Sequence, residues 1–256
     1  MKLAYRKYGS GQPLLILHGL FGQSDNWNTL AKRFGENGFE VYTLDQRNHG
    51  LSPHSESFSY KLMADDLKEF IDGHQLKDPI LLGHSMGGKT AMFFALQYKN
   101  AAAKLIVADM APVAYPPHHN EVLKALHSVD FTKIATRKEA EAILGEYIGD
   151  FGTRQFLLKN IYWKDTAGNL MDWRFDLDAI TRNYQEILAE VPDDSCETST
   201  LFIRGEKSHY VTDEDIPEIQ KRFPHFVLET IAGAGHWLHA EKPDAFYEAV
   251  LDFIKA

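Results

Sequence analysis

Short apolar runs alternate with segments of helical spacing along the first part of the chain. The apolar runs lie at residues 14–17, 41–44, 79–83 and 104–108, and the helical patterns lie at 26–37, 60–74 and 86–98. The apolar runs lack the strict polar–apolar alternation of a strand with one solvated face, so we expect both faces of these strands to be buried. The sequence therefore predicts an α/β fold, with a mostly parallel sheet covered by helices on both faces.

This alternation stops in the middle of the sequence. Prolines stand at 112, 116 and 117, and from about residue 120 to 188 the spacing is helical, with no convincing strand. Strand-like runs return at 201–203 and 226–231, and a helical pattern follows at 243–254. We therefore expect residues 1–111 and 196–256 to form one core, and residues 112–195 to form a helical cap inserted after the strand that ends at Asp109. Such a cap would lie over the carboxyl ends of the strands as a lid.

Composition narrows the classes of ligand. Hydrophobic residues make up 44% of the chain and charged residues 25%, which are ordinary values for a globular protein. The formal net charge of −9 disfavours binding to nucleic acid or to an anionic membrane surface. No apolar stretch approaches the roughly 18 residues of a membrane span. We therefore expect a small, uncharged molecule as the ligand.

The cysteine content and the first residues bear on the compartment. Cys196 is the only cysteine, so no intrachain disulfide can form. Charged residues interrupt the beginning of the sequence, which is unlike the apolar core of a secretory signal. These features predict a cytoplasmic protein. They leave the oligomeric state open between a monomer and a homodimer.

The pentapeptide Gly-His-Ser-Met-Gly at residues 83–87 matches the pattern G-x-S-x-G, between a buried strand and a helix. In this context the pattern indicates a nucleophilic serine on a sharp turn, because the glycines remove Cβ atoms that would clash there. We predict Ser85 as the nucleophile. The amide of Met86, at the start of the helix, is predicted to stabilise a developing oxyanion. The bland alternative is a glycine-rich strand-to-helix turn without function.

A second glycine-rich segment, His-Gly-Leu-Phe-Gly at residues 18–22, follows the first apolar run. A bend at this place can direct a second backbone N–H at the oxyanion. The Leu20 amide is the favoured donor, with the Phe21 amide as its alternative. His18 is expected to orient the turn rather than to act as a base.

The pentapeptide Gly-Ala-Gly-His-Trp at residues 233–237 follows the last apolar run. A histidine on a short loop after the last strand can reach back over the sheet edge to the serine. We therefore predict His236 as the general base. The chain has 12 histidines, and His118 and His119 are interpreted as surface or cap residues.

The carboxylate that would orient the histidine is less obvious. An aspartate is expected after the strand at 201–203, but Ser208 stands at that place. Asp109 directly follows the strand at 104–108, which should neighbour the nucleophile strand, so we predict Asp109 as the acid. Ser208 is predicted to add a hydrogen bond to the same network. Asp213 and Asp215 are the next candidates, although both look like the acidic start of a helix.

A rival interpretation reads the same segment as a phosphate-binding loop. Gly83 and Gly88-Lys89-Thr90 match the P-loop pattern, and Asp109 after its apolar run resembles a magnesium-binding aspartate. This reading leaves His18 and His236 unexplained, and the motif does not follow the first strand. The sequence contains no H-E-x-x-H and no C-x-x-C, so no metal site is expected.

Taken together, five segments resemble the YbfF-type esterases and the related mitochondrial abhydrolase-domain proteins. These are His-Gly-Leu-Phe-Gly, Asp-Gln-Arg-Asn-His-Gly, Gly-His-Ser-Met-Gly-Gly-Lys, Asp-Met-Ala-Pro and Ala-Gly-Ala-Gly-His-Trp. The resemblance implies an α/β-hydrolase core with a helical cap, and hydrolysis of carboxylic esters with short to medium acyl chains without metal or organic cofactor. It also implies the acid on the earlier strand, as at Asp109, and an extra serine, as at Ser208. Gln46 departs from some relatives, with little expected consequence.

The predicted function is therefore a serine carboxylesterase that works through an acyl-enzyme intermediate. Six side chains are candidate walls of the substrate pocket, although as a set they fit a cap core equally well: Phe21, His84, Tyr115, Phe156, Trp163 and Trp237. A thioesterase or lactonase on the same site stays open. A nucleotide-binding protein, and a non-catalytic receptor with the same fold, are the alternatives from other classes.

Overall fold

The computed structural model describes residues 1–164 and 170–256, and its core is a seven-stranded sheet in the order β1-β3-β2-β4-β5-β8-β9. The strands are β1 (Tyr5–Tyr8), β2 (Gln12–Leu17), β3 (Phe39–Leu44), β4 (Ile80–His84), β5 (Lys104–Ala108), β8 (Thr200–Gly205) and β9 (Phe226–Ile231). All neighbours pair in parallel except β1, which runs antiparallel to β3 at one edge. The predicted α/β class is confirmed, while the edge strand β1 was not predicted.

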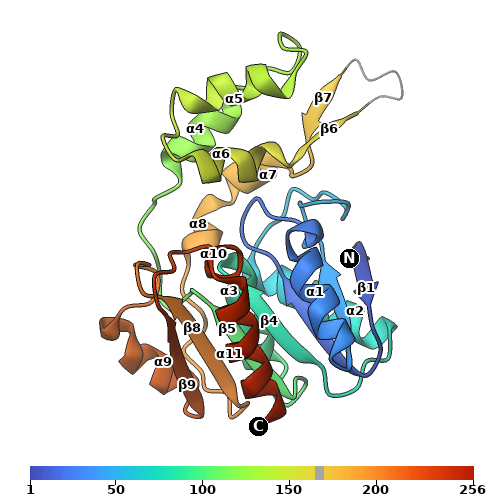
Figure 1. The fold of residues 1–256 in the computed structure, drawn as a ribbon, viewed down its shortest axis with the longest axis vertical. Helices are drawn as coiled ribbons and strands as arrows, with labels where there is room; N and C mark the ends of the chain where they lie inside the picture. Colours follow the sequence, from blue (N-terminus) through green and yellow to red (C-terminus); the bar gives the residue numbers. More distant parts are fainter. Residues whose placement is uncertain (165–169) are drawn as a thin grey trace.

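Helices cover both faces of this sheet, as Figure 1 shows. The core helices are α1 (Asn28–Glu36), α2 (Tyr60–Gly73), α3 (Met86–Gln97), α9 (Ile216–Arg222), α10 (Leu238–Glu241) and α11 (Pro243–Lys255). Successive residues of β2 pack on opposite faces: Leu15 and Leu17 join the cluster with α2, α3 and α9, whereas Leu14 and Ile16 join the cluster with α1 and α11. Two apolar clusters on two faces explain why the strands read as continuous apolar runs.

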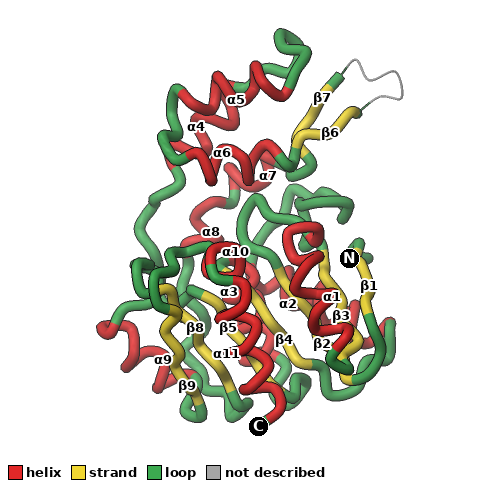
Figure 2. Tube along the Cα trace, in the orientation of Figure 1, coloured by secondary structure: helices red, strands yellow, loops and turns green. Residues whose placement is uncertain are grey.

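The segment between β5 and β8 stands above the carboxyl ends of the strands (Figures 1 and 2). Its elements are α4 (Asn120–Ser128), α5 (Arg137–Gly145), α6 (Phe151–Leu158), β6 (Ile161–Trp163), β7 (Met171–Trp173), α7 (Leu177–Arg182) and α8 (Tyr184–Leu188). The prediction of helix alone was wrong for β6 and β7, which form an antiparallel hairpin. Three-residue strands are too short to show a period of two, so the pattern could not reveal them. The part of the predicted helical stretch at 165–169 lies outside the described residues.

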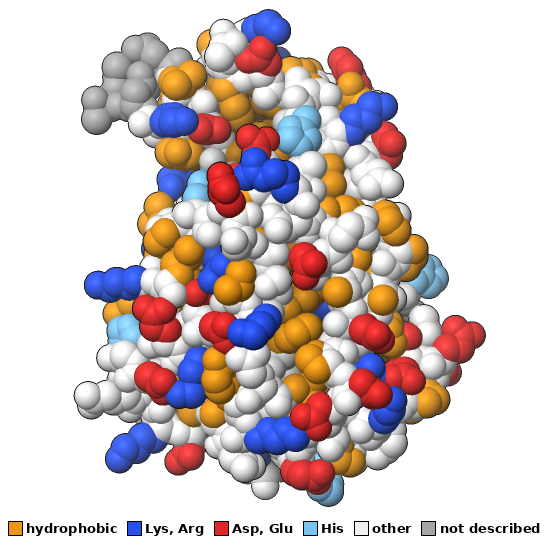
Figure 3. All heavy atoms as spheres, turned by 180° about the vertical axis from the view of Figure 1, so that it is seen from behind, with side chains coloured by type: hydrophobic (Ala, Val, Ile, Leu, Met, Phe, Trp, Pro, Cys, Tyr) orange, Lys and Arg blue, Asp and Glu red, His pale blue; other side chains and the backbone are white. Residues whose placement is uncertain are grey.

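The surface carries both signs of charge. On the face in Figure 3, acidic and basic side chains are interspersed among apolar and neutral ones. Several charged side chains of the protein form ion pairs, for example Lys99 with Asp194 and Lys221 with Asp193. None of the helices in the described part of the chain combines the length and the apolar character that crossing a bilayer requires.

Candidate active site

Ser85 lies at the sharp turn between β4 and α3. Its backbone has φ 52° and ψ −119°, and its N–H donates to the Ala108 oxygen at 3.0 Å. A Cβ atom at Gly83 would lie 2.1 Å from the Gly87 oxygen, and one at Gly87 would lie 2.3 Å from the Leu17 oxygen. Both distances are far below van der Waals contact, so both positions require glycine. The turn lifts Ser85 above the carboxyl end of the sheet while the flanking backbone segments stay in close contact.

His236 and Asp109 meet at the same edge. Asp109 follows β5, is completely buried and has φ 52°, whereas His236 follows β9 and keeps 20% of its side chain exposed. The His236 Nδ1 atom lies 2.7 Å from Asp109 Oδ2. A carboxylate at Nδ1 orients the ring, favours the proton on that nitrogen and leaves Nε2 as the proton acceptor.

Both oxygens of Asp109 have further partners. The Gly205 N–H donates to Oδ1 at 3.0 Å, and the Ser208 hydroxyl donates to Oδ2. Ser208 in turn accepts a hydrogen bond from the Tyr210 N–H at 3.2 Å. Three donors therefore surround the carboxylate, which compensates the cost of burying its charge.

The two alternative acids, Asp213 and Asp215, interact with groups other than His236. Asp213 pairs with Arg204 at 2.7 Å, and its side chain is 81% exposed. Asp215 accepts hydrogen bonds from the Thr212 N–H and hydroxyl at the start of a short helical turn. Neither carboxylate contacts His236 among the described residues.

Ser85 and His236 line one cavity of about 280 Å³. Among residues 1–164 and 170–256, no hydrogen bond joins the Ser85 hydroxyl to the His236 ring. Hydrogen bonds of this kind are often long in a ligand-free site and tighten when substrate binds. The shared cavity, rather than a formed hydrogen bond, is what relates these two side chains.

Two backbone N–H groups remain for an oxyanion. The Phe21 N–H donates to His49 Nε2 at 3.2 Å, so it is already used. Burial lowers the pKa of His49 to about 3, which keeps this ring neutral and able to accept. The amides of Leu20 and Met86 donate to no other described residue. Met86 is also the first residue of α3, where N–H groups lack helical partners.

The cavity at Ser85 contains most of the predicted pocket residues. Its walls are Gly19, Leu20, Phe21, His84, Ser85, His118, His119, Val122, Thr153, Phe156, Leu157, Tyr210, His236 and Trp237. Tyr115 lines a smaller adjoining cavity that Ser85 also lines. His84 Nε2 donates to the His236 main-chain oxygen at 2.8 Å, so it also supports the histidine loop.

Trp163 is the exception, because the structure places it outside both cavities. It ends β6 on the cap hairpin, and its side chain is 49% exposed. Neither cavity at Ser85 includes it. The prediction of a pocket wall at Trp163 was therefore wrong, because the unpredicted hairpin carries this segment away from the sheet edge.

Tyr210 and two histidines form part of the site that sequence reasoning missed. The Tyr210 ring stacks on the His236 ring with centroids 3.9 Å apart, and its hydroxyl lies 2.6 Å from His118 Nε2. His119 also lines the cavity, and burial lowers its pKa to about 3. The one signal for Tyr210 in the sequence is its place two residues after Ser208, in the loop where the carboxylate of the triad was expected.

Lys89 does not face the mouth of the turn, as a phosphate-binding lysine would. Its side chain is fully buried, and Nζ donates to the main-chain oxygens of Leu188 at 3.4 Å and Ala189 at 2.5 Å. The loop at 83–90 therefore offers no lysine to a phosphate. Within the described residues, no cluster of three or more histidine, cysteine or carboxylate side chains is arranged to hold a metal ion.

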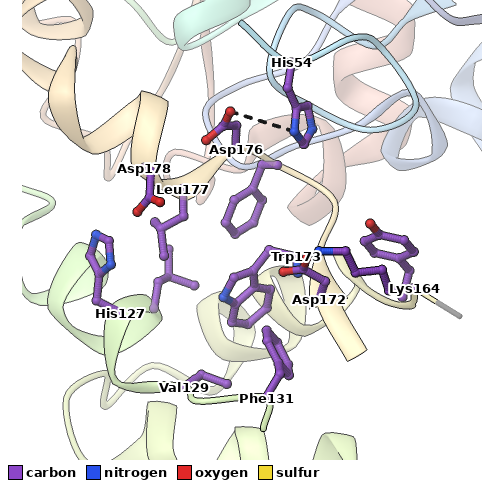
Figure 4. A pocket seen from close by; sticks show the side chains of 13 residues that line it. His54, His127, Val129, Phe131, Lys164, Asp172, Trp173, Asp176, Leu177 and Asp178 are labelled. Carbon is purple, nitrogen blue, oxygen red and sulfur yellow. Dashed lines mark hydrogen bonds and ion pairs between the residues drawn. The ribbon is translucent and has the colours of Figure 1, made fainter. Parts of the chain in front are cut away.

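A larger cavity of about 510 Å³ lies among α4, the hairpin of β6 and β7, and the start of α7, against the loop that carries His54 (Figure 4). Its walls include Trp173 and Asp176, whose Oδ2 lies 3.8 Å from His54 Nδ1. None of the predicted catalytic residues lines this cavity. The larger volume of this cavity is therefore no reason to place the candidate site there, because Ser85 and His236 line the other cavity.

Comparison with known proteins identifies the family to which the chain belongs. A model of the α/β-hydrolase fold family matches residues 12–243. The sn-1-specific diacylglycerol lipase ABHD11 of Danio rerio is 36% identical over 255 residues, covering 96% of this chain and 80% of the relative. Esterase YbfF of Escherichia coli is 35% identical, covering 96% and 94%. A solved marine microorganism esterase has a TM-score of 0.95 at 44% identity, covering 99% of each chain. The chain therefore belongs to the α/β-hydrolase fold family, together with these esterases and this lipase.

Proposed function

We propose that the protein is a serine carboxylesterase that hydrolyses small esters with short to medium acyl chains, through the triad Ser85, His236 and Asp109. The observation that supports it most is the contact of His236 Nδ1 with the buried Asp109, at the cavity that Ser85 lines. The relatives named as esterases and lipases support the same reaction class.

In the proposed first step, the Ser85 oxygen forms a bond to the ester carbonyl carbon while His236 Nε2 takes the hydroxyl proton. The carbonyl oxygen becomes an oxyanion, to which the amides of Leu20 and Met86 donate. The bond to the alcohol oxygen then breaks, and His236 returns its proton to that oxygen. The products of this step are the free alcohol and an acyl group on Ser85.

In the second step, water attacks the acyl carbon while His236 accepts one of its protons. The bond to Ser85 breaks, and the same proton returns to the serine oxygen. The net reaction consumes ester and water and yields acid and alcohol, so no cofactor or metal is required. In this proposal residues 112–195 act as a cap over the site, and Ser208 supports the carboxylate of Asp109.

Thioesters and lactones use the same nucleophile, base and oxyanion donors. They differ in the leaving group, a thiolate or a tethered alcohol, and so in the shape of the cavity rather than in the triad. Both therefore remain as alternative substrates of the same site.

Hydrolysis of p-nitrophenyl acetate by the wild type and by variants tests the proposal. Ser85→Ala and Asp109→Asn should each lower kcat by about 10³-fold or more, because each removes part of one catalytic unit. Asp213→Asn is the matched control and should retain activity. Wild-type rates no higher than those of Ser85→Ala would refute the esterase function, and full activity in Asp109→Asn would refute the assigned acid.

A further inference from the structure

Ser85 stands between two cavities of very different size. The larger has a volume of about 280 Å³ and the smaller about 20 Å³. Ser85, Leu20 and Tyr210 line both of them. A cavity volume of about 10–15 Å³ is enough to hold one water molecule. The smaller cavity therefore has room for a group of about methyl size, and the larger has room for a group of many heavy atoms.

The position of His236 decides which part of an ester enters each cavity. His236 and Trp237 line only the larger cavity, whereas Met86 and Met110 line only the smaller one. A general acid must lie next to the leaving oxygen in order to protonate it. The alcohol therefore belongs in the larger cavity, and the acyl chain, on the other side of the carbonyl carbon, is directed into the smaller one.

Hydrogen bonds fix the wall that limits the smaller cavity. This wall includes Ile187 and Leu188 at the end of α8. The Tyr60 hydroxyl donates to the Ile187 oxygen at 2.9 Å, and the Tyr115 N–H donates to the Leu188 oxygen at 2.9 Å. Lys89 Nζ also donates to the Leu188 oxygen, at 3.4 Å. Because three donors hold the main chain of this wall, it resists the displacement that a longer acyl chain would require.

The walls of the larger cavity are mostly apolar. This surface is formed by Phe21, Val122, Leu157 and the tilted ring pair Phe156 and Trp237, whose centroids lie 4.3 Å apart. Such walls favour an alcohol with a bulky apolar or aromatic group.

On the basis of the proposed esterase function, we infer that the preferred substrates are esters of very short acids, above all acetate, with bulky apolar alcohols. The acyl cavity limits the acid, and the cavity at His236 accommodates the alcohol. This inference narrows the short to medium acyl range, and it assigns Ile187 as a residue that determines acyl length.

Two ester series measured on the wild type test this inference. With p-nitrophenol as the common alcohol, kcat/KM should fall at least tenfold from acetate to hexanoate. With acetate as the common acid, 2-naphthyl acetate should be hydrolysed at least as well as phenyl acetate, whose leaving group is similar. Equal rates on hexanoate and acetate, or a tenfold loss on the naphthyl ester, would overturn the assignment of the cavities.

Substitutions that shorten one side chain in each cavity show which wall limits the length of the acyl chain. Ile187→Ala should raise the ratio of hexanoate to acetate hydrolysis about fivefold or more, because it enlarges the acyl cavity. Val122→Ala removes atoms from the larger cavity and should leave this ratio unchanged. Tyr60→Phe retains the packing and removes only the hydroxyl that holds Ile187, so it should shift the ratio in the same direction as Ile187→Ala. Unchanged ratios in both variants would overturn the role of this wall.

The outcomes distinguish a failure of the proposed esterase function from a failure of the inference on acyl length. If no ester is hydrolysed faster than by Ser85→Ala, both the esterase function and this inference fail. If esters are hydrolysed with no dependence on acyl length, only the inference fails.

Discussion

The side-chain nitrogen of Lys89, on α3, donates a hydrogen bond to the main-chain oxygen of Ala189, 2.5 Å away, just after the end of α8. The Lys89 side chain is fully buried, with Nζ 4.7 Å from the centroid of the Tyr115 ring. None of the ion pairs in the described residues includes Lys89. Burial lowers the pKa of Lys89 to about 7. The contact between α3 and the end of α8 therefore contains a buried lysine whose charged form is disfavoured by burial.

This lysine should make stability depend on pH. Its pKa is about 7 in the folded protein and 10.5 in the reference state, so between these values the unfolded chain binds more protons. The contribution of Lys89 to the free energy of unfolding is then fully present above about pH 10.5, and it is lost as the pH falls to about 7. Urea unfolding of wild type should show this rise, by a few kcal/mol, and Lys89→Met should flatten it. Lys32→Met, at an exposed position, should keep the wild-type slope; an unchanged slope in Lys89→Met would contradict the prediction.

Ser208 should affect turnover more than binding. Its hydroxyl donates to Asp109 Oδ2, the oxygen that also contacts His236. Without this donor the carboxylate is less well held, so Ser208→Ala should lower kcat for p-nitrophenyl acetate about tenfold with little change in KM. Ser208→Thr keeps a hydroxyl and should recover most of the loss. A rise in KM alone would show that Ser208 acts on substrate binding instead.

His49 should act through the loop that carries Leu20, the proposed oxyanion donor. It accepts the Phe21 N–H at 3.2 Å, next to the free Leu20 amide. His49→Phe leaves the Phe21 amide without a partner and loosens this loop, so kcat should fall about tenfold. His49→Gln offers a carbonyl oxygen as acceptor and should retain more activity than His49→Phe. Equal activity in all three proteins would show that the loop holds its position without His49.

Two substitutions on one helix distinguish the two large cavities. Val122 and His127 both lie on α4, but Val122 lines the cavity at Ser85 and His127 lines the one in the cap. Val122→Trp should lower kcat/KM for 2-naphthyl acetate at least tenfold, because the indole occupies the space of the alcohol. His127→Trp should leave kcat/KM unchanged. The reverse result would assign the substrate to the cap cavity, and circular dichroism checks that both variants fold.

Much of the fold was predictable because its signals are local. Continuous apolar strands and intervening helical patterns predicted the doubly covered parallel sheet, and the motif resemblance predicted the family; both are confirmed. The edge strand β1 and the hairpin of β6 and β7 were missed. In β1 every residue but the last is exposed, and each strand of the hairpin has three residues, so neither produces a readable apolar period.

In the candidate site, too, the residues with local signals could be predicted, and those placed by distant segments could not. Ser85 and His236 stand in short glycine-rich contexts whose steric demands are visible in the sequence. Asp109 could be proposed because carboxyl ends of neighbouring parallel strands share an edge. Trp163 could not be excluded from the pocket by any local pattern, since its place depends on the course of the cap chain.

The sequence by itself determined the layers of the sheet and the order of the proposed nucleophile, acid and base, because strand burial and glycine-rich turns depend on neighbouring residues. Only the tertiary structure decided that Tyr210 stacks on His236, that Lys89 holds the end of α8, and that a cavity of methyl size adjoins Ser85. These contacts join segments far apart in the chain. Their geometry follows from how the cap packs on the core, which no local pattern of residues encodes.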